Sequence, residues 1–211
     1  MIPTKEAWNE ALIARHGADL HRRFSAATVA VCGLGGLGSN IAIALARAGI
    51  GRLLLIDFDR VDLPNLHRQQ YKASQIGLHK TAALAENLAE LAPYTEVRAV
   101  TAKITEENCA ALLQEADIIC EAFDNAASKA MLANGVFEQL PGRYLVASSG
   151  MAGMDTPNTI RTRKITDRFY LCGDGVSDAA DTMGLVAPRV MVCAAHQAHT
   201  VLRILAGEFD V

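Results

Sequence analysis

Residues 28–57, TVAVCGLGGLGSNIAIALARAGIGRLLLID, decide the fold of this chain. The first five form a short apolar run, which is typical of a buried strand. A glycine-rich turn at 33–38 follows and opens a helical pattern over 36–48. A second apolar run at 52–56 ends in Asp57. This order predicts a strand, a helix and a second, parallel strand joined by a right-handed crossover.

The rest of the chain continues the alternation. Helical patterns at 82–91, 106–114 and 126–139 separate apolar runs near 96–100, 117–120 and 144–147. They predict an α/β fold: a Rossmann-like, doubly wound, mostly parallel sheet covered by helices on both faces. Runs at 159–164 and 168–171 predict added antiparallel strands near the C-terminus, before a final helix from Pro188 to about Gly207.

Two domain-level expectations follow. Residues 1–25 form an N-terminal helical segment, interrupted at His16 and Gly17, and residues 26–211 form one domain. The segment between Gly173 and Gly184 is rich in glycine, aspartate and alanine, which predicts a flexible loop.

Composition limits the classes of function. The chain has 211 residues, 51% of them hydrophobic, and a formal net charge of −3 without a basic block. Binding to nucleic acid or to an anionic membrane through overall charge is therefore not favoured. No apolar stretch approaches the ~20 residues of a transmembrane helix, and the N-terminus has no export signal, so we expect a cytoplasmic protein. Five scattered cysteines fit a reducing compartment.

The glycine-rich turn predicts a nucleotide site. Glycines allow a tight turn and close approach of the backbone to phosphate, while the following helix presents free N–H groups. Asp57 comes 19 positions after the last glycine, near the spacing of about 20 expected for a carboxylate that binds ribose. No G-K-[ST] follows, so this is not a Walker loop. The glycines that form it are Gly33, Gly35, Gly36 and Gly38.

The segment after Asp57, DFDRVDLPNLHRQQ at 57–70, points to a triphosphate. Asn65, Arg68 and Gln69 follow the acid directly, and Lys80 begins a later helical pattern. Two cations beside the glycine turn would neutralise a triphosphate, whereas the pyrophosphate of NAD needs fewer. The alternative interpretation is that Arg68 and Lys80 are solvated surface charges.

Together these motifs resemble the ThiF/MoeB/HesA family, the bacterial relatives of ubiquitin-activating enzymes. The resemblance rests on GLGGLGS, DFDRVDLPNLHRQ, the start of the helix at Lys80, FDN at 123–125 and the segment 184–188. The resemblance covers most of the chain, from about 26 to 207. The short chain is most similar to a compact ThiF subfamily of thiamine biosynthesis. The resemblance implies that residues 26–211 are an ATP-binding adenylylation domain.

The resemblance also implies an activity and site residues. The activity is ATP-dependent adenylylation of the C-terminal glycine carboxylate of a ubiquitin-like sulfur carrier protein, similar to ThiS, with release of pyrophosphate. Asp57 would hold the ribose, and Arg68, Lys80 and Asp124 would be catalytic, Asp124 through Mg²⁺. The residues assigned to ATP are Gly33, Gly35, Gly36, Gly38, Asp57, Asn65, Arg68, Gln69 and Lys80. A helix cap is the alternative role for Asp124 and Asn125.

The family further implies a homodimer in which an N-terminal arginine of the partner reaches the nucleotide. Arg15, Arg22 and Arg23 are candidates, Arg15 being preferred. The paired C-x-x-C motifs of the family's structural zinc are missing, so we expect no zinc. No cysteine lies between 173 and 188, where some members carry one for a covalent link to the carrier. Cys172 is the nearest substitute.

Three other functions stay open. A nicotinamide-dependent dehydrogenase would use the glycine turn and Asp57 but leave Arg68, Lys80 and Asp124 without a role. A non-catalytic module could bind a ubiquitin-like protein. Activation of a carboxylate on modified tRNA, as in a threonylcarbamoyladenosine dehydratase, would share the adenylylation chemistry, although no basic face is evident in the sequence.

Overall fold

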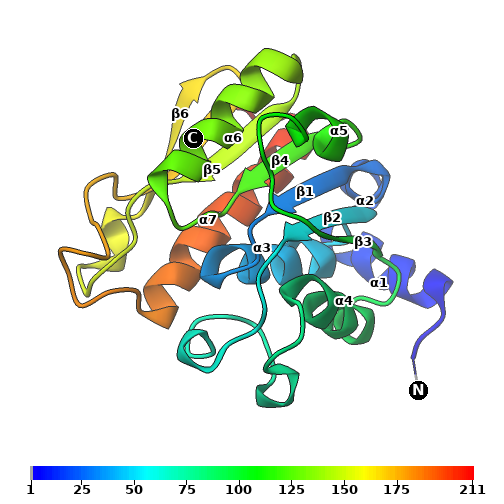
Figure 1. Ribbon diagram of the computed structural model, residues 1–211. Helices are drawn as coiled ribbons and strands as arrows, with labels where there is room; N and C mark the ends of the chain where they lie inside the picture. The colour runs from blue at the N-terminus through cyan, green and yellow to red at the C-terminus, as the bar shows by residue number, and fades with distance from the viewer. Residues whose placement is uncertain (1) are drawn as a thin grey trace.

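A computed structural model describes residues 2–211 and contains a seven-stranded sheet in the order β3-β2-β1-β4-β5-β7-β6 (Figure 1). The strands are β1 (Thr28–Cys32), β2 (Arg52–Asp57), β3 (Glu96–Thr101), β4 (Ile118–Glu121), β5 (Tyr144–Ser148), β6 (Arg161–Thr166) and β7 (Phe169–Gly173). All neighbouring pairs are parallel except β6 with β7. The predicted α/β class and the mostly parallel, doubly wound sheet are confirmed.

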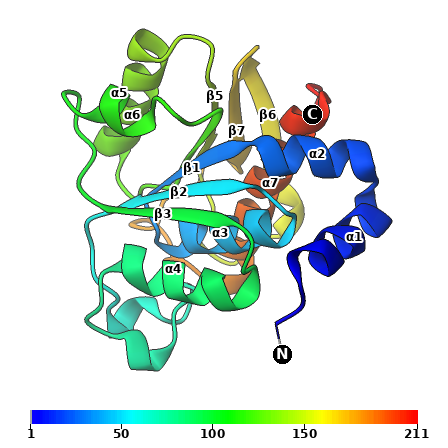
Figure 2. The same cartoon turned by 90° about the vertical axis from the view of Figure 1, so that its right-hand side faces the viewer.

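Helices cover both faces of the sheet (Figure 2). α3, α4 and α7 lie on one face and α5 and α6 on the other. The helices are α1 (Lys5–His16), α2 (Ala18–Ala26), α3 (Gly36–Arg47), α4 (Lys80–Leu91), α5 (Cys109–Leu113), α6 (Ala126–Gln139) and α7 (Ala187–Ala206). Short 3-10 turns span Leu63–Asn65, Ala73–Gln75 and Pro157–Thr159. The sheet is therefore the middle of three layers.

The strand alternation builds two cores. Val29 and Val31 of β1 face the cluster under α3 and α7, whereas Ala30 and Cys32 face the cluster under α5 and α6. All four side chains are fully buried. A strand that is buried on both faces needs a continuous apolar sequence, and this explains why TVAVC carries no charge.

The C-terminal strands differ from their prediction in one detail. β7 pairs parallel with β5, and only the β6–β7 hairpin is antiparallel. α7 then begins one residue before Pro188 and ends at Gly207, whose φ of 86° is the left-handed conformation that glycine favours at a helix end.

Two helix starts also differ from the sequence expectation. α5 is shorter than the segment 106–114, because the Asn108 side chain accepts the Thr105 N–H and holds a turn there. α4 starts at Lys80, two residues before the helical pattern at 82–91 and at the position that the family resemblance implies, and the Lys80 N–H donates to the Asp59 carbonyl.

The N-terminal residues form two helices, broken at Gly17 with a φ of 84°. Trp8, Leu20 and Phe24 contact the core beneath α3 and α7. The division into a segment at 1–25 and a domain at 26–211 stays a prediction. Among residues 2–211, no helix combines the length and the apolar character that crossing a membrane requires.

Candidate functional site

A pocket of about 690 Å³ lies at the carboxyl ends of the central strands. It opens where β1 separates β2 from β4, the point at which the strand order reverses. Ligands of open α/β sheets bind at such a point because the two crossovers leave it in opposite directions. The residues predicted from sequence that line it are Gly33, Gly35, Gly36, Asp57, Asn65, Arg68, Gln69, Lys80 and Asp124.

The glycine turn packs too closely for larger residues. A Cβ on Gly38 would lie 1.8 Å from the Gly33 carbonyl oxygen, and one on Gly33 would lie 2.8 Å from the Ala122 carbonyl oxygen. Gly33 also has a φ of 89°. Gly38 therefore supports the turn from beneath and does not line the pocket, whereas Gly35 has open space above it, with its nearest neighbour 3.8 Å away.

Asp57 fixes the shape of the turn. Its Oδ2 accepts the Leu34 N–H at 2.6 Å and its Oδ1 accepts the Asp59 N–H at 2.8 Å. The residue is 8% exposed and lies on the pocket wall. A charged acceptor with two backbone donors holds the strand end and the glycine turn together.

Asn65 and Arg68 form a donor group on one side of the pocket. Arg68 Nη2 donates to Asn65 Oδ1 at 3.0 Å. Two buried atoms nearby, Arg68 Nε and Gln69 Oε1, have no hydrogen-bond partner among the described residues. Burial lowers the pKa of Arg68, and the negative charge of Asp124 acts in the opposite direction. Since buried polar groups are normally paired, this side of the pocket is suited to a polar ligand, to which Arg68 Nε offers a charged donor and Gln69 Oε1 an acceptor.

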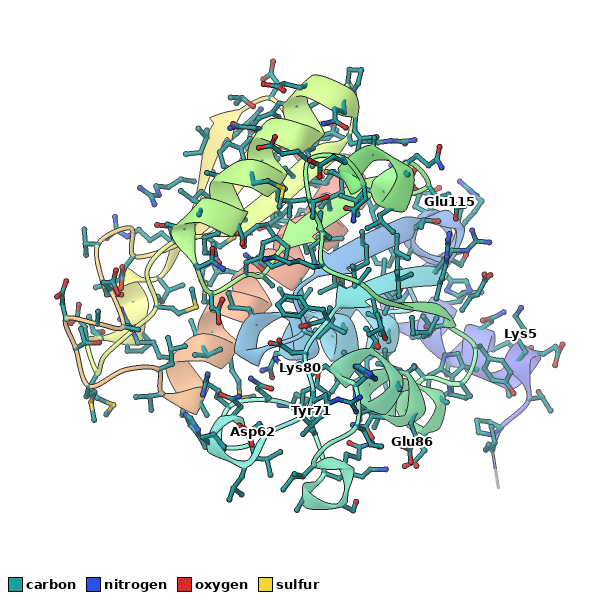
Figure 3. The ribbon with its side chains drawn as sticks, viewed as in Figure 1. Lys5, Asp62, Tyr71, Lys80, Glu86 and Glu115 are labelled. Atoms are coloured by element: carbon teal, nitrogen blue, oxygen red, sulfur yellow. The ribbon has the colours of Figure 1, made fainter. Side chains whose placement is uncertain are left out.

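Lys80 is buried at the start of α4, in the lower half of the face shown in Figure 3. Its side chain is 6% exposed, and Nζ contacts Asp59 Oδ2 at 2.8 Å. The interpretation of Lys80 as a solvated surface charge is therefore wrong. A buried ammonium with a half-exposed partner can keep one contact and turn another donor toward a phosphate.

The helix-cap role considered for Asp124 and Asn125 belongs to Asn125, whereas the metal role of Asp124 stays a prediction. Asn125 caps α6, because its Oδ1 accepts the Ser128 N–H at 2.8 Å. Asp124 is exposed on the pocket wall, and its nearest side-chain contact is Asn125 Nδ2 at 3.5 Å. Among the described residues, no group of three or more His, Cys, Asp or Glu side chains could hold a metal ion. Asp124 thus offers a single free carboxylate.

A buried ion pair that was not predicted from the sequence lies beside the pocket, which its lysine lines. Lys129 Nζ contacts both carboxylate oxygens of Glu121, at 3.0 and 2.9 Å, and Glu121 is 1% exposed. Lys129 also donates to Ser148 Oγ at 3.0 Å. Burial raises the pKa of Glu121, while Lys129 and backbone donors oppose that shift. In the sequence, the only indication of this pair is that the charged Glu121 directly follows the apolar run at 117–120.

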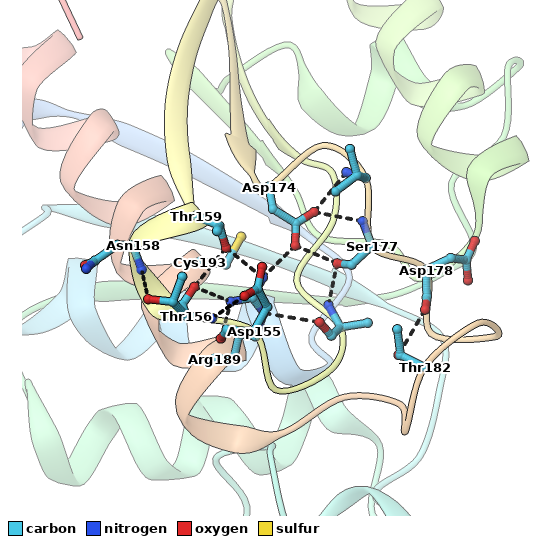
Figure 4. A network of polar contacts seen from close by, with 12 residues as sticks. Asp155, Thr156, Asn158, Thr159, Asp174, Ser177, Asp178, Thr182, Arg189 and Cys193 are labelled. Carbon is cyan, nitrogen blue, oxygen red and sulfur yellow. Dashed lines mark hydrogen bonds and ion pairs between the residues drawn. The ribbon is translucent and has the colours of Figure 1, made fainter.

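A second missed pair, Arg189 and Asp174, organises the far wall (Figure 4). Arg189 Nη2 contacts Asp174 Oδ2 at 2.6 Å, and its other nitrogens donate to the carbonyls of Ala152, Asp155 and Thr156. Burial alone would raise the pKa of Asp174, but hydrogen bonds from Ser177, Val176 and Arg189 lower it to about 2.

The loop at 173–184 has an anchored base and an exposed tip. Asp174 holds the N–H groups of Val176 and Ser177, and Ser177 Oγ accepts the Ala152 N–H. Ser177, Asp178 and Ala179 line the pocket, while residues 178–183 are exposed. The expected flexibility does not extend to the base of the loop.

All five cysteines are fully buried: Cys32, Cys109, Cys120, Cys172 and Cys193. Burial raises the pKa of each thiol, that of Cys193 to about 12. Cys172 points toward Thr162 and Thr200, on the side of α7. The expectation that Cys172 could substitute for a reactive loop cysteine is wrong, because its thiol is inaccessible and stays protonated.

The arginines proposed to reach a partner's nucleotide lie elsewhere. Arg15, on α1, is exposed, and Arg22 and Arg23 form ion pairs with Asp19 on α2. None of the three lines the pocket of its own chain.

Similarity to known proteins identifies the family of the chain. The model of the ThiF family matches residues 9–210. The molybdopterin-synthase adenylyltransferase of Escherichia coli (strain K12) is 30% identical over 185 residues, covering 85% of this chain and 73% of that protein. The sulfur carrier protein adenylyltransferase of Thermus thermophilus is 32% identical over 136 residues, covering 64% of this chain and 45% of that protein.

Solved structures share the fold. The tRNA N6-threonylcarbamoyladenosine dehydratase TcdA of E. coli, in complex with AMP, superimposes with a TM-score of 0.86 over 99% of this chain and 98% of that one, at 22% identity. The chain spans less than half the length of most curated relatives that it matches.

Proposed function

The chain belongs to the ThiF family, and from that premise we propose that it is an adenylyltransferase that activates the C-terminal glycine carboxylate of a ubiquitin-like sulfur carrier protein. The observation that carries the proposal is one pocket that holds the glycine turn, the ribose acid Asp57, the donors Arg68 and Lys80, and the free carboxylate Asp124. A nicotinamide dehydrogenase would need only the first two of these features.

The charges of the pocket suit a triphosphate. Arg68 and Lys80 line the same pocket as the glycine turn, and both are at least partly desolvated. Charge-assisted hydrogen bonds strengthen in such a setting. We assign Asn65, Arg68, Gln69 and Lys80 to the phosphates, and Asp57 to the ribose.

Magnesium fits the remaining donor. Mg²⁺ is usually held by one or two carboxylates together with phosphates and water, and Asp124 is a free carboxylate on the pocket wall beside Arg68. We propose that Asp124 holds the ion, which when bound with ATP would neutralise phosphate charge.

The reaction needs positioning more than proton transfer. A terminal carboxylate is ionised at neutral pH, so one of its oxygens attacks the α-phosphorus without a general base. The bond from that phosphorus to the β-phosphate oxygen breaks, and pyrophosphate leaves. Arg68 and Lys80 stabilise the charge that builds on the phosphate oxygens, since fixed donors in a dry site act without reorganisation.

The loop at 173–184 suits a flexible carrier tail. Its base forms the wall of the pocket through Ser177, and its tip is exposed. A tail that ends in glycines is narrow enough to enter beside it. We further propose a homodimer with Arg15 near the partner's nucleotide, a cytoplasmic protein, and thiamine as the product pathway.

The experiment is ATP–pyrophosphate exchange with Mg²⁺, with and without a carrier of the ThiS type that ends in Gly-Gly. Exchange should depend on the carrier and should fall at least ~100-fold in Arg68→Ala and in Asp124→Ala. Arg203→Ala, on the far end of α7, is the control and should exchange normally. ATP binding without exchange for any carrier would overturn the sulfur-carrier proposal.

Modified tRNA is the second candidate substrate. One observation favours it: Arg161, Arg163 and Lys164 of β6 are all exposed at the edge of the sheet. Such a basic strand can contact phosphates, and sequence analysis did not identify it. If tRNA rather than a carrier protein supports exchange, and if the rate falls steeply with salt, this second function replaces the first. If the protein binds a carrier but catalyses no ATP–pyrophosphate exchange, it is a binding module.

A further inference from the structure

The ion pair between Glu121 and Lys129 lies where three elements of the site meet. Glu121 ends β4, Lys129 lies in α6, and Ser148 ends β5. Lys129 Nζ bonds both Glu121 oxygens, the Ser148 carbonyl at 3.2 Å and Ser148 Oγ at 3.0 Å. A single ammonium group thus joins the carboxyl ends of two neighbouring strands to the helix that follows Asp124.

The same carboxylate holds the turn that carries Asp124. Glu121 Oε1 accepts the Phe123 N–H at 2.6 Å, and its Oε2 lies 3.5 Å from the Ser148 N–H. On the other side, Ala122 donates its N–H to the Cys32 carbonyl at 2.9 Å. Ala122 is therefore fixed by β1, whereas the segment from Phe123 to Asp124 depends on Glu121.

The pair is poorly placed to add stability. Removing two charges from water costs nearly as much as their attraction returns, and apolar residues of similar volume often replace such pairs without loss. Glu121 is 1% exposed, and the Lys129 side chain is 26% exposed and lines the pocket. The net charge of the Glu121–Lys129 pair is zero, so the pair adds little attraction for ATP. The remaining contribution of the pair is to fix the positions of the groups that it bonds.

We propose that Lys129 and Glu121 are positioning residues for adenylylation: they hold the Phe123–Asp124 turn so that the Asp124 carboxylate stands at a fixed place above the glycine turn. This rests on the proposed function, in which Asp124 holds the magnesium ion that accompanies ATP. Lys129 itself contacts neither substrate nor nucleotide in this role, because its donors are taken by Glu121 and Ser148.

The test compares three variants by ATP–pyrophosphate exchange. Lys129→Met removes the ammonium and should lower kcat about 30- to 100-fold, because small displacements of a catalytic group have effects of that size. KM for ATP should change less than about threefold, since Asp57, Arg68 and Lys80 are untouched. Lys129→Arg, which can bond both Glu121 oxygens, should keep kcat within about threefold.

The double variant Glu121→Gln with Lys129→Met separates positioning from folding. It carries no buried unpaired charge, so its unfolding midpoint in urea should return close to that of the wild type. Its kcat should stay as low as that of Lys129→Met. If kcat recovers together with stability, or if Lys129→Met exchanges at the wild-type rate, the positioning role is overturned.

A second readout does not need activity. Amide hydrogen exchange of the peptide that covers 122–125 should be at least tenfold faster in Lys129→Met, with the peptide at 28–36 unchanged. Lys72→Met is the matched control, since Lys72 forms an exposed ion pair with Glu90 outside the pocket. If the wild-type protein shows no ATP–pyrophosphate exchange with any substrate, the proposed function is refuted. If the amide protection of residues 122–125 is unchanged in Lys129→Met, the positioning role is refuted.

Discussion

The Asp57 carboxylate accepts the backbone N–H of Leu34 at 2.6 Å, across the edge between β2 and the glycine turn. The acid that we propose for ribose binding is therefore also a structural part of the turn. If Asp57 also binds the nucleotide, as we propose, stability and nucleotide binding depend on the same side chain, and a substitution there should affect both.

Asp57→Asn tests that double role. The amide keeps one acceptor but presents an N–H to the other backbone donor, since Asp57 accepts from both Leu34 and Asp59. We expect the free energy of unfolding to fall by about 1–3 kcal/mol, the range for a lost hydrogen bond to a charged group. Urea denaturation measures the change. ATP affinity, by calorimetry, should fall at least ~10-fold. Full stability with weakened ATP binding would limit Asp57 to the ribose role.

Two glycines of the turn should respond differently to alanine. A Cβ at Gly38 would meet the Gly33 carbonyl oxygen at 1.8 Å, so Gly38→Ala should unfold the protein or shift its Tm by many degrees. Gly35 has a φ of −73° and no neighbour closer than 3.8 Å. Gly35→Ala should therefore keep the wild-type Tm yet weaken ATP binding, because the added methyl group faces the pocket. Equal Tm losses would contradict this assignment.

The Asp174–Arg189 pair gives a pH dependence. The pKa of Asp174 lies near 2 when folded and about 3.9 when unfolded, so its contribution to stability is present above about pH 4. It is lost as the pH falls toward 2, and its size is about 2 kcal/mol. The difference in unfolding free energy between wild type and Asp174→Asn should therefore shrink between pH 5 and pH 2.5. A constant difference would show that the Asp174 charge is not the cause.

Thiol accessibility tests the burial of the cysteines. A disulfide reagent should modify fewer than one of the five thiols in the native protein and all five in guanidinium chloride. Cys172→Ser should keep carrier-dependent exchange within about threefold, because Cys172 faces α7. A stoichiometric adduct between the carrier and Cys172 would contradict the burial seen here.

Local patterns were enough to predict the sheet and one half of the site. The β1-α3-β2 unit follows from apolar runs around a glycine turn, and parallel strands bring their carboxyl ends to one edge. Asp57, Arg68, Lys80 and Asp124 therefore converge on the pocket as expected. Their spacing along the chain carries that information.

The other half depends on pairs that local patterns do not reveal. In the sequence, Lys129 is indistinguishable from other lysines in helical patterns. Only the packing of α6 over β4 brings it to Glu121. Arg189 follows a proline at a helix start, and its acceptors come from two distant loops. The burial of Cys172 depends in the same way on α7, which covers that part of β7. Such contacts are fixed by tertiary packing alone.

The anchoring of the loop base by Asp174 and Arg189 has a consequence for variation of the protein. Inserted or exchanged sequence between Ala179 and Met183 changes an exposed tip outside the pocket lining, and lengthening a surface loop costs little free energy. The nucleotide pocket would keep its wall at Ser177 throughout. The tip is thus a site where new partner preferences can be grafted without rebuilding the half of the molecule that carries the candidate nucleotide site.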